Sequence, residues 1–509
     1  MKKYILMVFM SVCGLTVFAQ AEFDALRLSQ TDIIGTARYV SMSGAFGALG
    51  GDMSAIGLNP AGIGIYRSSE VSFSPSLQQD FSKADFNGKL AEANRLKVLM
   101  NGFGYVGSFR TYDESAISNF NFGISYQTVA DFNRNTNVLG VDRPTSLLDR
   151  IVAVENTMWN DNGTHPYHSN FYSFVNGVHV IEQFVNDNNE NRYRPRLDNG
   201  ELVSLSNMKM QETGGINSWN FTLGANYNHN LYLGIGIGIQ SVLYEKSTIF
   251  SEEYQLGGGT ELRNAMTTTG SGIDFKAGVI YRPVPELRLG VSYRSGTYYT
   301  LTDVFNASMA SWNFRDPITD VLYNPDPKVI GNEQTNDYML KTPWQLTLSA
   351  AYQFENKGLF SVDFECVDSR STDLKSGDGF EMEDINYYME NDFKLSYNVR
   401  VGGEMRLTDN VSARLGAAYY MSPLVSQVET YDIATAYTSP EYSVVKSTWY
   451  GSMGLGYRSG AFFADAALQE RVSNEHFYNF CDMSNINVPK FADLSRRKMN
   501  LVLTAGFKF

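Results

Sequence analysis

The sequence is short of several kinds of residue, and each shortage excludes a class of protein. Only 3 of its 509 residues are cysteine, so no disulfide framework is indicated. Beyond the first residues, no stretch reaches the run of about eighteen apolar residues that a membrane-spanning helix needs. Basic residues are fewer than acidic ones, 41 against 54, which argues against nucleic acid as a partner.

Proline is also scarce, at 14 residues, and no linker-like stretch divides the chain. A soluble protein of this length would be expected to split into several domains. The 44 glycines, 31 tyrosines and 32 phenylalanines favour one large β-structure instead. The choice therefore lies between a soluble sandwich or propeller and a membrane-spanning barrel.

Residues 1–19 have the pattern of a secretory signal peptide. Lys2 and Lys3 precede an apolar run, and the small residue Ala19 follows it. The run is too short to span a membrane comfortably. We therefore expect cleavage after Ala19 and export of the chain.

Residues 393–408 alternate strictly between apolar and polar side chains. Successive side chains of a strand point to opposite faces, so one face of this strand is apolar and the other is polar. A single strand of this kind fits a soluble sheet equally well. The apolar positions are Phe393, Leu395, Tyr397, Val399, Val401, Met405 and Leu407.

The same alternation recurs along the chain and predicts fourteen strands. Many exceed the usual length of about five or six residues and suit the ten or so tilted residues that cross a bilayer. Tyr227, Tyr281 and Tyr352 end apolar faces, as the aromatic girdles of outer-membrane barrels do. The predicted strands are 71–79, 98–110, 119–131, 218–229, 231–250, 270–283, 287–305, 341–354, 358–374, 392–408, 411–424, 446–459, 461–475 and 495–509.

The connections between these strands alternate between long and short. The odd ones have about 17 to 86 residues and the even ones about 1 to 8, as expected for outside loops and periplasmic turns. The chain ends on Phe509, which resembles the signal that barrel-assembly machinery recognises. We therefore predict an all-β fold, a 14-stranded antiparallel transmembrane β-barrel in the bacterial outer membrane. It spans residues 70–509 and has one long extracellular loop at about 132–217.

The predicted strand at 231–250 indicates what faces the barrel interior. A face of glycines would let another segment approach the wall, so we expect it to point inward. A bend in a long strand is the alternative explanation. The glycine face holds Gly234, Gly236 and Gly238, and the opposite face holds Ile235, Ile237 and Ile239.

The residues before the first strand lack this alternation. Fourteen strands enclose a lumen too wide for the side chains of the wall to fill. Within residues 20–69, the stretch Gly35–Arg67 has eight glycines, which permit close packing inside a tube. We therefore predict that residues 20–69 form a hatch inside the barrel.

Several stretches of the chain resemble a known family. They are Ala37-Arg38, Ser43–Gly51 (SGAFGALGG), Asp52, Ser54-Ala55, Asn59–Gly62 (NPAG), Thr342–Trp344 and Val399–Pro423. Together with the predicted barrel, they resemble the FadL-type outer-membrane transporters of long-chain fatty acids and aromatic hydrocarbons, and most closely the Bacteroidetes-type members. The resemblance covers nearly the whole mature chain except residues 132–217.

The resemblance implies passive uptake of a long-chain fatty acid or a similar hydrophobic molecule, with no enzyme activity, cofactor or metal. In the family, the hatch rearranges and a kink in the third strand lets the ligand leave sideways into the membrane. By resemblance, Asn59, Pro60, Ala61 and Gly62 form the gating motif, and Gly123 is the candidate for the kink. We expect a monomer surrounded by outer-membrane lipid and lipopolysaccharide.

The residues that would capture a ligand cannot be transferred from the family. Its capture groove is built from the loops after the fifth and seventh strands, whereas the longest predicted loop here follows the third. A carboxylate headgroup would need a cationic side chain beside an apolar pocket. Arg38 and Arg67 in the predicted hatch are candidates for such contacts, although a plug also needs charges to meet a polar wall.

Other functions find less support in the sequence. The glycine-rich stretch lacks both a βαβ context and a Gly-Lys-Ser/Thr sequence, which excludes a nucleotide-binding loop. No Ser-His-Asp spacing indicates a barrel hydrolase. His165 and His168 leave a haem-uptake receptor as one alternative, and a surface protein that binds a partner through residues 132–217 as another.

Overall fold

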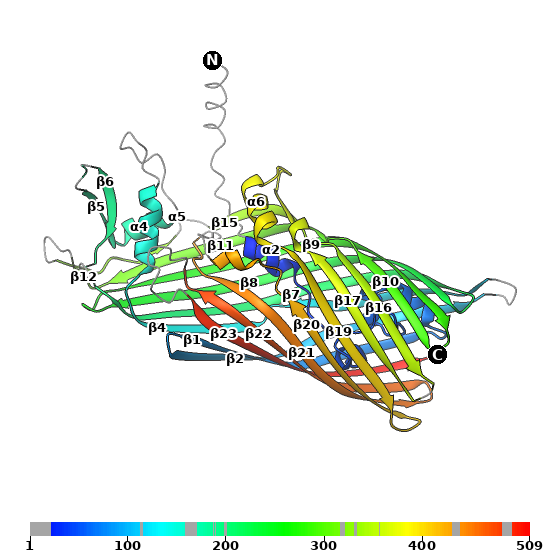
Figure 1. Cartoon of the computed structure of the whole chain (residues 1–509). Helices are drawn as coiled ribbons and strands as arrows, with labels where there is room; N and C mark the ends of the chain where they lie inside the picture. Colours follow the sequence, from blue (N-terminus) through cyan, green and yellow to red (C-terminus); the bar gives the residue numbers. More distant parts are fainter. Residues whose placement is uncertain are drawn as a thin grey trace, which may run out of the picture.

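The computed structural model shows an antiparallel barrel of fourteen strands (Figure 1). Backbone groups in hydrocarbon need hydrogen-bond partners, and a closed barrel leaves no edge without one. β1 (Glu70–Phe86) pairs with both β2 (Lys89–Arg110) and β23 (Ala492–Lys508), which closes the ring. The predicted fold class is therefore confirmed. The structure describes residues 22–111, 116–157, 170–186, 188, 190–197, 201–315, 321–329, 333–355, 357–429, 438–480 and 491–509.

Four of the remaining barrel strands are assembled from two consecutive segments each. These are β3 (Ile117–Asp131) with β4 (Arg134–Arg143), β10 (Leu287–Arg294) with β11 (Tyr298–Trp312), β15 (Gln334–Lys341) with β16 (Gln345–Phe354), and β17 (Gly358–Asp368) with β18 (Asp373–Ser376). The other strands are β7 (Val203–Tyr227), β8 (Leu231–Tyr254), β9 (Gly259–Val284), β19 (Leu395–Arg406), β20 (Val411–Met421), β21 (Tyr442–Ser459) and β22 (Phe462–Tyr478).

Short elements decorate one end of the barrel, and the C-terminus lies at the other (Figure 1). The decorated end carries α4 (Leu147–Thr157), α5 (Asn170–Gly177), the hairpin of β5 (Ile181–Val185) and β6 (Asn191–Pro195), and α6 (Glu383–Asp392). Further short pieces are β12 (Phe314–Arg315), β13 (Leu322–Tyr323), β14 (Lys328–Val329), η3 (Ser369–Ser371) and η4 (Ser426–Glu429). In outer-membrane barrels the short turns face the periplasm, which makes the decorated end the outer one. No helix in the described ranges is both long and apolar enough to cross a bilayer.

The two faces of each strand meet different surroundings. On β8, Ile235 and Ile239 are 62% and 48% exposed on the outside of the barrel, whereas Gly236 and Gly238 between them are buried. The prediction that the glycine face points inward is confirmed. Cys366 lies on the outward face of β17 and is free.

The strands extend beyond the membrane-crossing part, and two predicted outside loops are wrong. β1 and β2 are joined by the turn Asn87–Gly88, where about 18 residues of loop had been predicted, and both turn residues have positive φ, 52° and 81°. Asn-Gly is the sequence that favours such a two-residue hairpin turn. β8 and β9 likewise approach each other to a short turn around Gly257. The outward side chains of these extensions are mostly polar, so the alternation that predicts a membrane strand does not reach them.

The predicted loop at about 132–217 is shorter in the structure. β4 continues the third strand, and β7 begins at Val203 rather than near residue 218. Both ends of the predicted loop therefore belong to strands that pair with each other. Between these strands lie α4, α5 and the β5–β6 hairpin.

The third barrel strand is the irregular one. β3 pairs with β2 only from Asn119 to Gln127, and its register against β7 shifts near Thr128. After Phe132 and Asn133, the β4 segment pairs with β7 alone, so Lys89–Asn101 of β2 has no backbone ladder on that side. In place of the ladder, the side chain of Asn135 on β4 donates a hydrogen bond to the carbonyl of Asn94 on β2.

A charged side chain on the outward face tests the position of the membrane. We expect Ile237→Arg, about a third of the way along β8 from its periplasmic end, to cost about 2–4 kcal/mol of folding free energy in a bilayer. Leu256→Arg, in the outer turn where Leu256 is 70% exposed, should cost about 0–1 kcal/mol. Urea titration in liposomes, read as the heat-dependent gel shift, measures both. Equal costs would contradict a bilayer around the part of β8 that contains Ile237.

Candidate functional site

The N-terminal segment packs against inward-facing side chains from all around the barrel. It contains α2 (Glu22–Ser29), α3 (Ala37–Ser41), η1 (Ser54–Gly57) and η2 (Pro60–Ile65). The amide of Ala37 donates to Thr504 on β23 at 2.7 Å, and that of Phe46 donates to Asp363 on β17 at 3.0 Å. On a third side, Asn121 of β3 donates to the carbonyl of Ile63 at 2.6 Å. Small residues are needed here because the backbone itself reaches the wall.

The Asn59–Gly62 turn is fixed by its own hydrogen bonds. Asn59 is 1% exposed, and its side-chain oxygen caps η2 by accepting the amide of Ala61 at 3.0 Å. Its side-chain nitrogen donates to the carbonyl of Gly47 at 2.6 Å. Pro60 occupies the first position of η2, where its missing N–H costs nothing.

Glycines of the barrel wall receive this turn. A Cβ atom built on Gly278 of β9 would lie 1.9 Å from the side-chain oxygen of Asn59. One built on Gly234 of β8 would lie 2.2 Å from the carbonyl carbon of Pro60. Neither distance is compatible with a side chain, so the turn and the wall fit only because these positions are glycine. The turn lines none of the four cavities described below.

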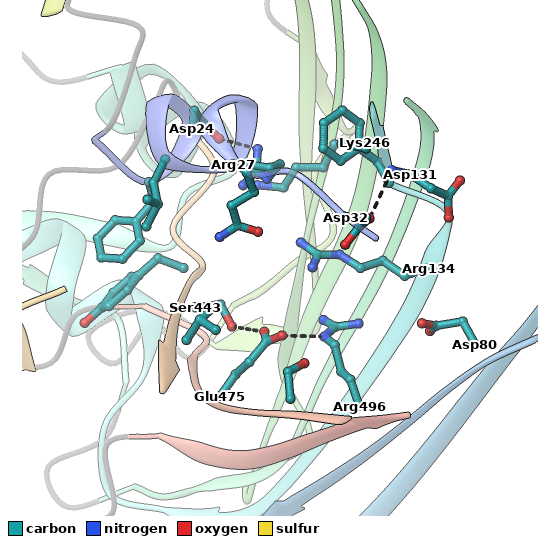
Figure 2. A pocket seen from close by; sticks show the side chains of 18 of the residues that line it. Asp24, Arg27, Asp32, Asp80, Asp131, Arg134, Lys246, Ser443, Glu475 and Arg496 are labelled. Carbon is teal, nitrogen blue, oxygen red and sulfur yellow. Dashed lines mark hydrogen bonds and ion pairs between the residues drawn. The ribbon is translucent and has the colours of Figure 1, made fainter. Parts of the chain in front are cut away.

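A cavity of about 90 Å³ lies beside α2 on the outer side of the segment (Figure 2). We call it the outer cavity. Charges of both signs line it, and many are already paired: Arg496 with Glu475 at 3.0 Å, and Lys498 with Asp131 at 3.1 Å. Glu475 also accepts a hydrogen bond from Ser443 at 2.6 Å. The outer cavity is therefore polar and nearly charge-balanced.

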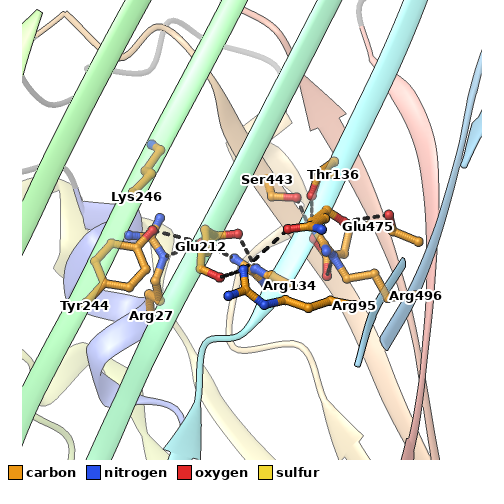
Figure 3. A network of polar contacts seen from close by, with 12 residues as sticks. Arg27, Arg95, Arg134, Thr136, Glu212, Tyr244, Lys246, Ser443, Glu475 and Arg496 are labelled. Atoms are coloured by element: carbon orange, nitrogen blue, oxygen red, sulfur yellow. Dashed lines mark hydrogen bonds and ion pairs between the residues drawn. The ribbon is translucent and has the colours of Figure 1, made fainter. Parts of the chain in front are cut away.

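A second network ties α2 to the wall beside this cavity (Figure 3). Glu212 on β7 forms an ion pair with Arg134 on β4 and accepts a hydrogen bond from Tyr244 on β8 at 2.8 Å. Arg27 of α2 reaches Glu212 at 3.7 Å and stacks over the ring of Tyr244. α2, β4 and β8 are thereby joined through one buried carboxylate on β7.

Asp32 links the segment to the irregular third strand. Its amide donates to the carbonyl of Val129 at 2.9 Å, and its carboxylate accepts the amide of Asp131 at 3.3 Å. Burial would raise the pKa of Asp32, but Arg471 and Lys498 hold it below its usual value. Asp32 lines the outer cavity and two further cavities of about 100 and 80 Å³. It is thus the residue where the three spaces meet.

The other predicted site residues lie in different places. Arg38 and Arg67 both line a fourth cavity, of about 360 Å³, at the short-turn end. Gly123 lies in regular pairing with Val106 and Thr222, away from the register shift of its strand. His165 and His168 fall outside the described residues, as does Cys481. No cluster of metal-ligating side chains occurs in the described part of the chain.

Sequence reasoning missed Asp32 and the charged wall residues near it. Asp32 is a single acidic residue in a stretch without periodicity, so no motif marks it. Arg471 and Glu475 do carry a signal, because they occupy the inward positions of a strand whose outward positions are apolar nearer the membrane. A charged inward face predicts a polar lumen, but it does not predict which charges meet.

Comparison with known proteins places the fold. No protein-family model matches the chain, and no curated protein sequence matches it. Among solved structures, a Pseudomonas aeruginosa FadL homologue matches with a TM-score of 0.51 at 14% identity, covering 94% of this chain and 99% of its own. A TodX deltaS2S3 mutant, titled a monoaromatic hydrocarbon channel, matches with a TM-score of 0.51 at 12% identity, covering 94% and 100%. The chain therefore has the fold of the FadL-type barrels, as the sequence resemblance predicted.

We expect Gly278→Val to push the Asn59–Gly62 turn off the wall, because its side chain would overlap Asn59. The displaced segment should open the lumen and raise the ion conductance of single channels in planar bilayers at least about tenfold over the wild type. Gly451→Val is the matched control, since a Cβ there meets nothing within 4 Å. Wild-type conductance in Gly278→Val would show that the turn does not seal the barrel.

The docking of α2 should depend on pH through Glu22. This carboxyl is 6% exposed and faces Asp392 of α6, and burial together with that neighbour raises the pKa of Glu22 to about 9. Because the protonated form of Glu22 favours the docked helix, the stabilisation is fully present below about pH 4.5. As pH rises toward 9, the equilibrium constant for docking falls by up to about tenfold per pH unit. Amide exchange of α2 measures this. Glu22→Gln should remove the dependence, and unchanged dependence in that variant would exclude Glu22 as its source.

Proposed function

We propose that the chain is an outer-membrane transporter for passive uptake of long-chain fatty acids or similar hydrophobic small molecules. The single observation that carries the proposal is an apolar core inside the outer end of a FadL-like barrel. Titles of the similar structures name a FadL homologue and a monoaromatic hydrocarbon channel. A hydrophobic cargo is the chemistry that such a core would receive.

The inward face changes character along the strands. On β9, Asp274 and Lys276 point inward at the membrane level, whereas Leu262 and Met266 point inward near the outer end. The outward face changes in the opposite sense, from Phe275 at the membrane level to the charged residues Glu261 and Arg263 near the outer end. The outer end therefore encloses apolar side chains, and these include Tyr244, Phe250, Leu262, Met266, Leu301, Phe305, Met309, Tyr338 and Leu340.

The outer core is joined to the N-terminal segment. Phe23, Leu26 and Leu28 of α2 belong to the same buried cluster as the inward side chains of the outer wall. Several members are methionine or aromatic residues, which adapt to ligands of irregular shape. In the proposed function, residues 20–69 act as a hatch, and a hydrophobic ligand replaces part of this packing when it enters.

Lateral release into the membrane is the second part of the proposal. The exit is the stretch where β2 and β4 lack a backbone ladder, beside the register shift of β3. On the outside of this stretch, Leu96 and Val98 of β2 are 62% and 72% exposed. An apolar ligand that passes between β2 and β4 would therefore meet apolar surface rather than water.

No described residue favours the two alternatives. The three described histidines are dispersed, and the ring of His476 is hydrogen-bonded to Glu429 at 2.5 Å rather than facing an open site. The haem receptor, which rests on His165 and His168, stays a prediction. Partner binding through residues 132–217 likewise stays a prediction, because exposed elements of this kind occur on many barrels.

Uptake assays test the proposed function directly. A deletion strain carrying the wild-type gene should accumulate radiolabelled oleate at least about tenfold faster than one carrying an empty vector. Toluene and haem, offered separately, identify the cargo class. Accumulation of haem alone would overturn the proposal in favour of the receptor.

A crosslink tests the lateral exit. The side chain of Asn135 on β4 donates to the carbonyl of Asn94 on β2 at 3.0 Å, so cysteines at these positions can be joined by a short bis-maleimide. In a background of Cys366→Ser and Cys481→Ser, the linked Asn94→Cys/Asn135→Cys protein should lose about 90% of its oleate uptake, because the gap cannot widen.

The control crosslink joins strands that are already paired. Asn207 of β7 and Ser251 of β8 are register partners, so linking Asn207→Cys to Ser251→Cys should leave uptake unchanged. Full uptake through the linked β2–β4 gap would exclude this exit and leave hydrophobic uptake itself standing.

A further inference from the structure

The cavity at the short-turn end, about 360 Å³, is larger than the three that surround Asp32. We call it the periplasmic cavity. Leu49, Gly50, Gly51, Ile65 and Tyr66 of the N-terminal segment form its roof. The barrel wall adds Ala351, Tyr352 and Leu359. Its upper part is thus built mainly from small and apolar groups.

Cationic side chains dominate the rest of the lining. Six cations face three carboxylates there, although the whole chain carries a net charge of −13. The outer cavity shows no such excess. The cations are Arg38, Arg67, Arg288, Arg406, Arg458 and Lys508, and the carboxylates are Glu286, Glu355 and Glu404.

The carboxylates do not neutralise the cations within the described residues. Glu404 is divided between Arg38 of the segment, at 3.0 Å, and Arg414 of β20, at 2.6 Å. The side chains of Arg67, Arg406 and Arg458 form no ion pair and no hydrogen bond with any part of the chain that the structure describes. Three guanidinium groups with ten or more free N–H donors between them therefore border one cavity.

Arg67 is held in position although its side chain is free. The preceding carbonyl, of Tyr66, accepts hydrogen bonds from Asn119 at 2.9 Å and from Asn121 at 3.0 Å. Two residues later, Ser69 and Phe509 exchange backbone hydrogen bonds at 3.0 Å in both directions. A fixed backbone on both sides lowers the entropy cost of using the Arg67 side chain as a ligand.

We propose that the periplasmic cavity binds the carboxylate of a small amphiphilic anion, with Arg67, Arg406 and Arg458 around the carboxylate and the apolar roof above the alkyl chain. Solvated arginines alone would explain the charge, but they would not explain an apolar roof directly above them. The volume suits a small ligand. Arginine matches a carboxylate with two parallel N–H donors.

The site also bears on the hatch. Arg38 donates to the carbonyl of Gly51 at 3.4 Å and pairs with Glu404, so it connects the roof to the wall. Because Arg38 lines the same cavity as the three arginines, a carboxylate bound there would compete with Glu404 for Arg38. Occupancy from the periplasmic side therefore loosens one of the contacts that hold the segment down.

A local probe tests the binding. Ser68 lines the cavity, so a trifluoromethyl label on Ser68→Cys, in the Cys366→Ser/Cys481→Ser background, reports on it in phosphatidylcholine nanodiscs. We expect octanoate to shift the fluorine resonance and octanol to leave it unchanged. The apparent affinity should fall several-fold when salt rises from about 50 to about 500 mM, because exposed charges are screened.

Matched variants separate the site from general charge. Arg67→Gln/Arg406→Gln/Arg458→Gln should weaken octanoate binding at least tenfold. Arg263→Gln/Arg370→Gln/Arg497→Gln removes the same charge from exposed arginines elsewhere, with side chains 61%, 50% and 61% exposed, and should leave binding unchanged. The heat-dependent gel shift verifies that both proteins are folded. Equal weakening by the two sets, or equal shifts with octanol and octanoate, would overturn the proposal.

A lipid phosphate is the other source of a suitable anion. In phosphatidylglycerol nanodiscs without octanoate, the resonance should stay at its unbound position. If the lipid alone moves it and octanoate then adds nothing, the carboxylate assignment is wrong. Binding is measured on purified protein, so failure here leaves the uptake proposal intact, and failure of uptake leaves this site intact.

Discussion

The tight fit of the N-terminal segment against glycines of the wall is the interaction on which the rest of the structure depends. Closing fourteen strands satisfies the backbone but creates a lumen that side chains cannot fill. The backbone of the N-terminal segment comes close to the wall at positions where the wall carries glycine, as on β8 and β9 opposite Asn59 and Pro60. The fixed position of the segment and the cavities that remain around it both follow from that close approach.

The lining of the barrel interior changes with distance from this contact. Beneath it lies a cavity with excess positive charge, around it lie balanced ion pairs, and above it lies an apolar core. The strand period of two keeps the same residue parity inward throughout, so a single strand such as β9 must switch polarity along its length. Because of this switch, the outer surface of the same strand is apolar where it faces lipid and polar where it faces water beyond the membrane.

Much of the barrel could be predicted from the sequence, because alternation in the membrane is dictated by lipid outside and polar groups inside. All fourteen strands and the inward glycines of β8 were predictable for that reason. The ends of the strands were not, because beyond the membrane the outward residues become polar and the pattern looks like loop, even across the Asn87–Gly88 turn. The contact of Asp32 with β3, and the position of Arg67 and Arg458 around one cavity, depend on how distant parts of the chain pack together, which local pattern does not encode.

Two parts of the segment are held in different ways. The Asn59–Gly62 turn is buried, capped and pressed against the wall, so displacing it requires breaking close packing as well as hydrogen bonds. The stretch around Asp32 is different, since it is held by a few polar contacts and is bordered by three cavities. Those contacts join it to β3 beside the β2–β4 gap. In the proposed function, a ligand that enters the outer core would therefore act first on the part of the segment attached to the proposed exit, while the turn would stay packed against the wall.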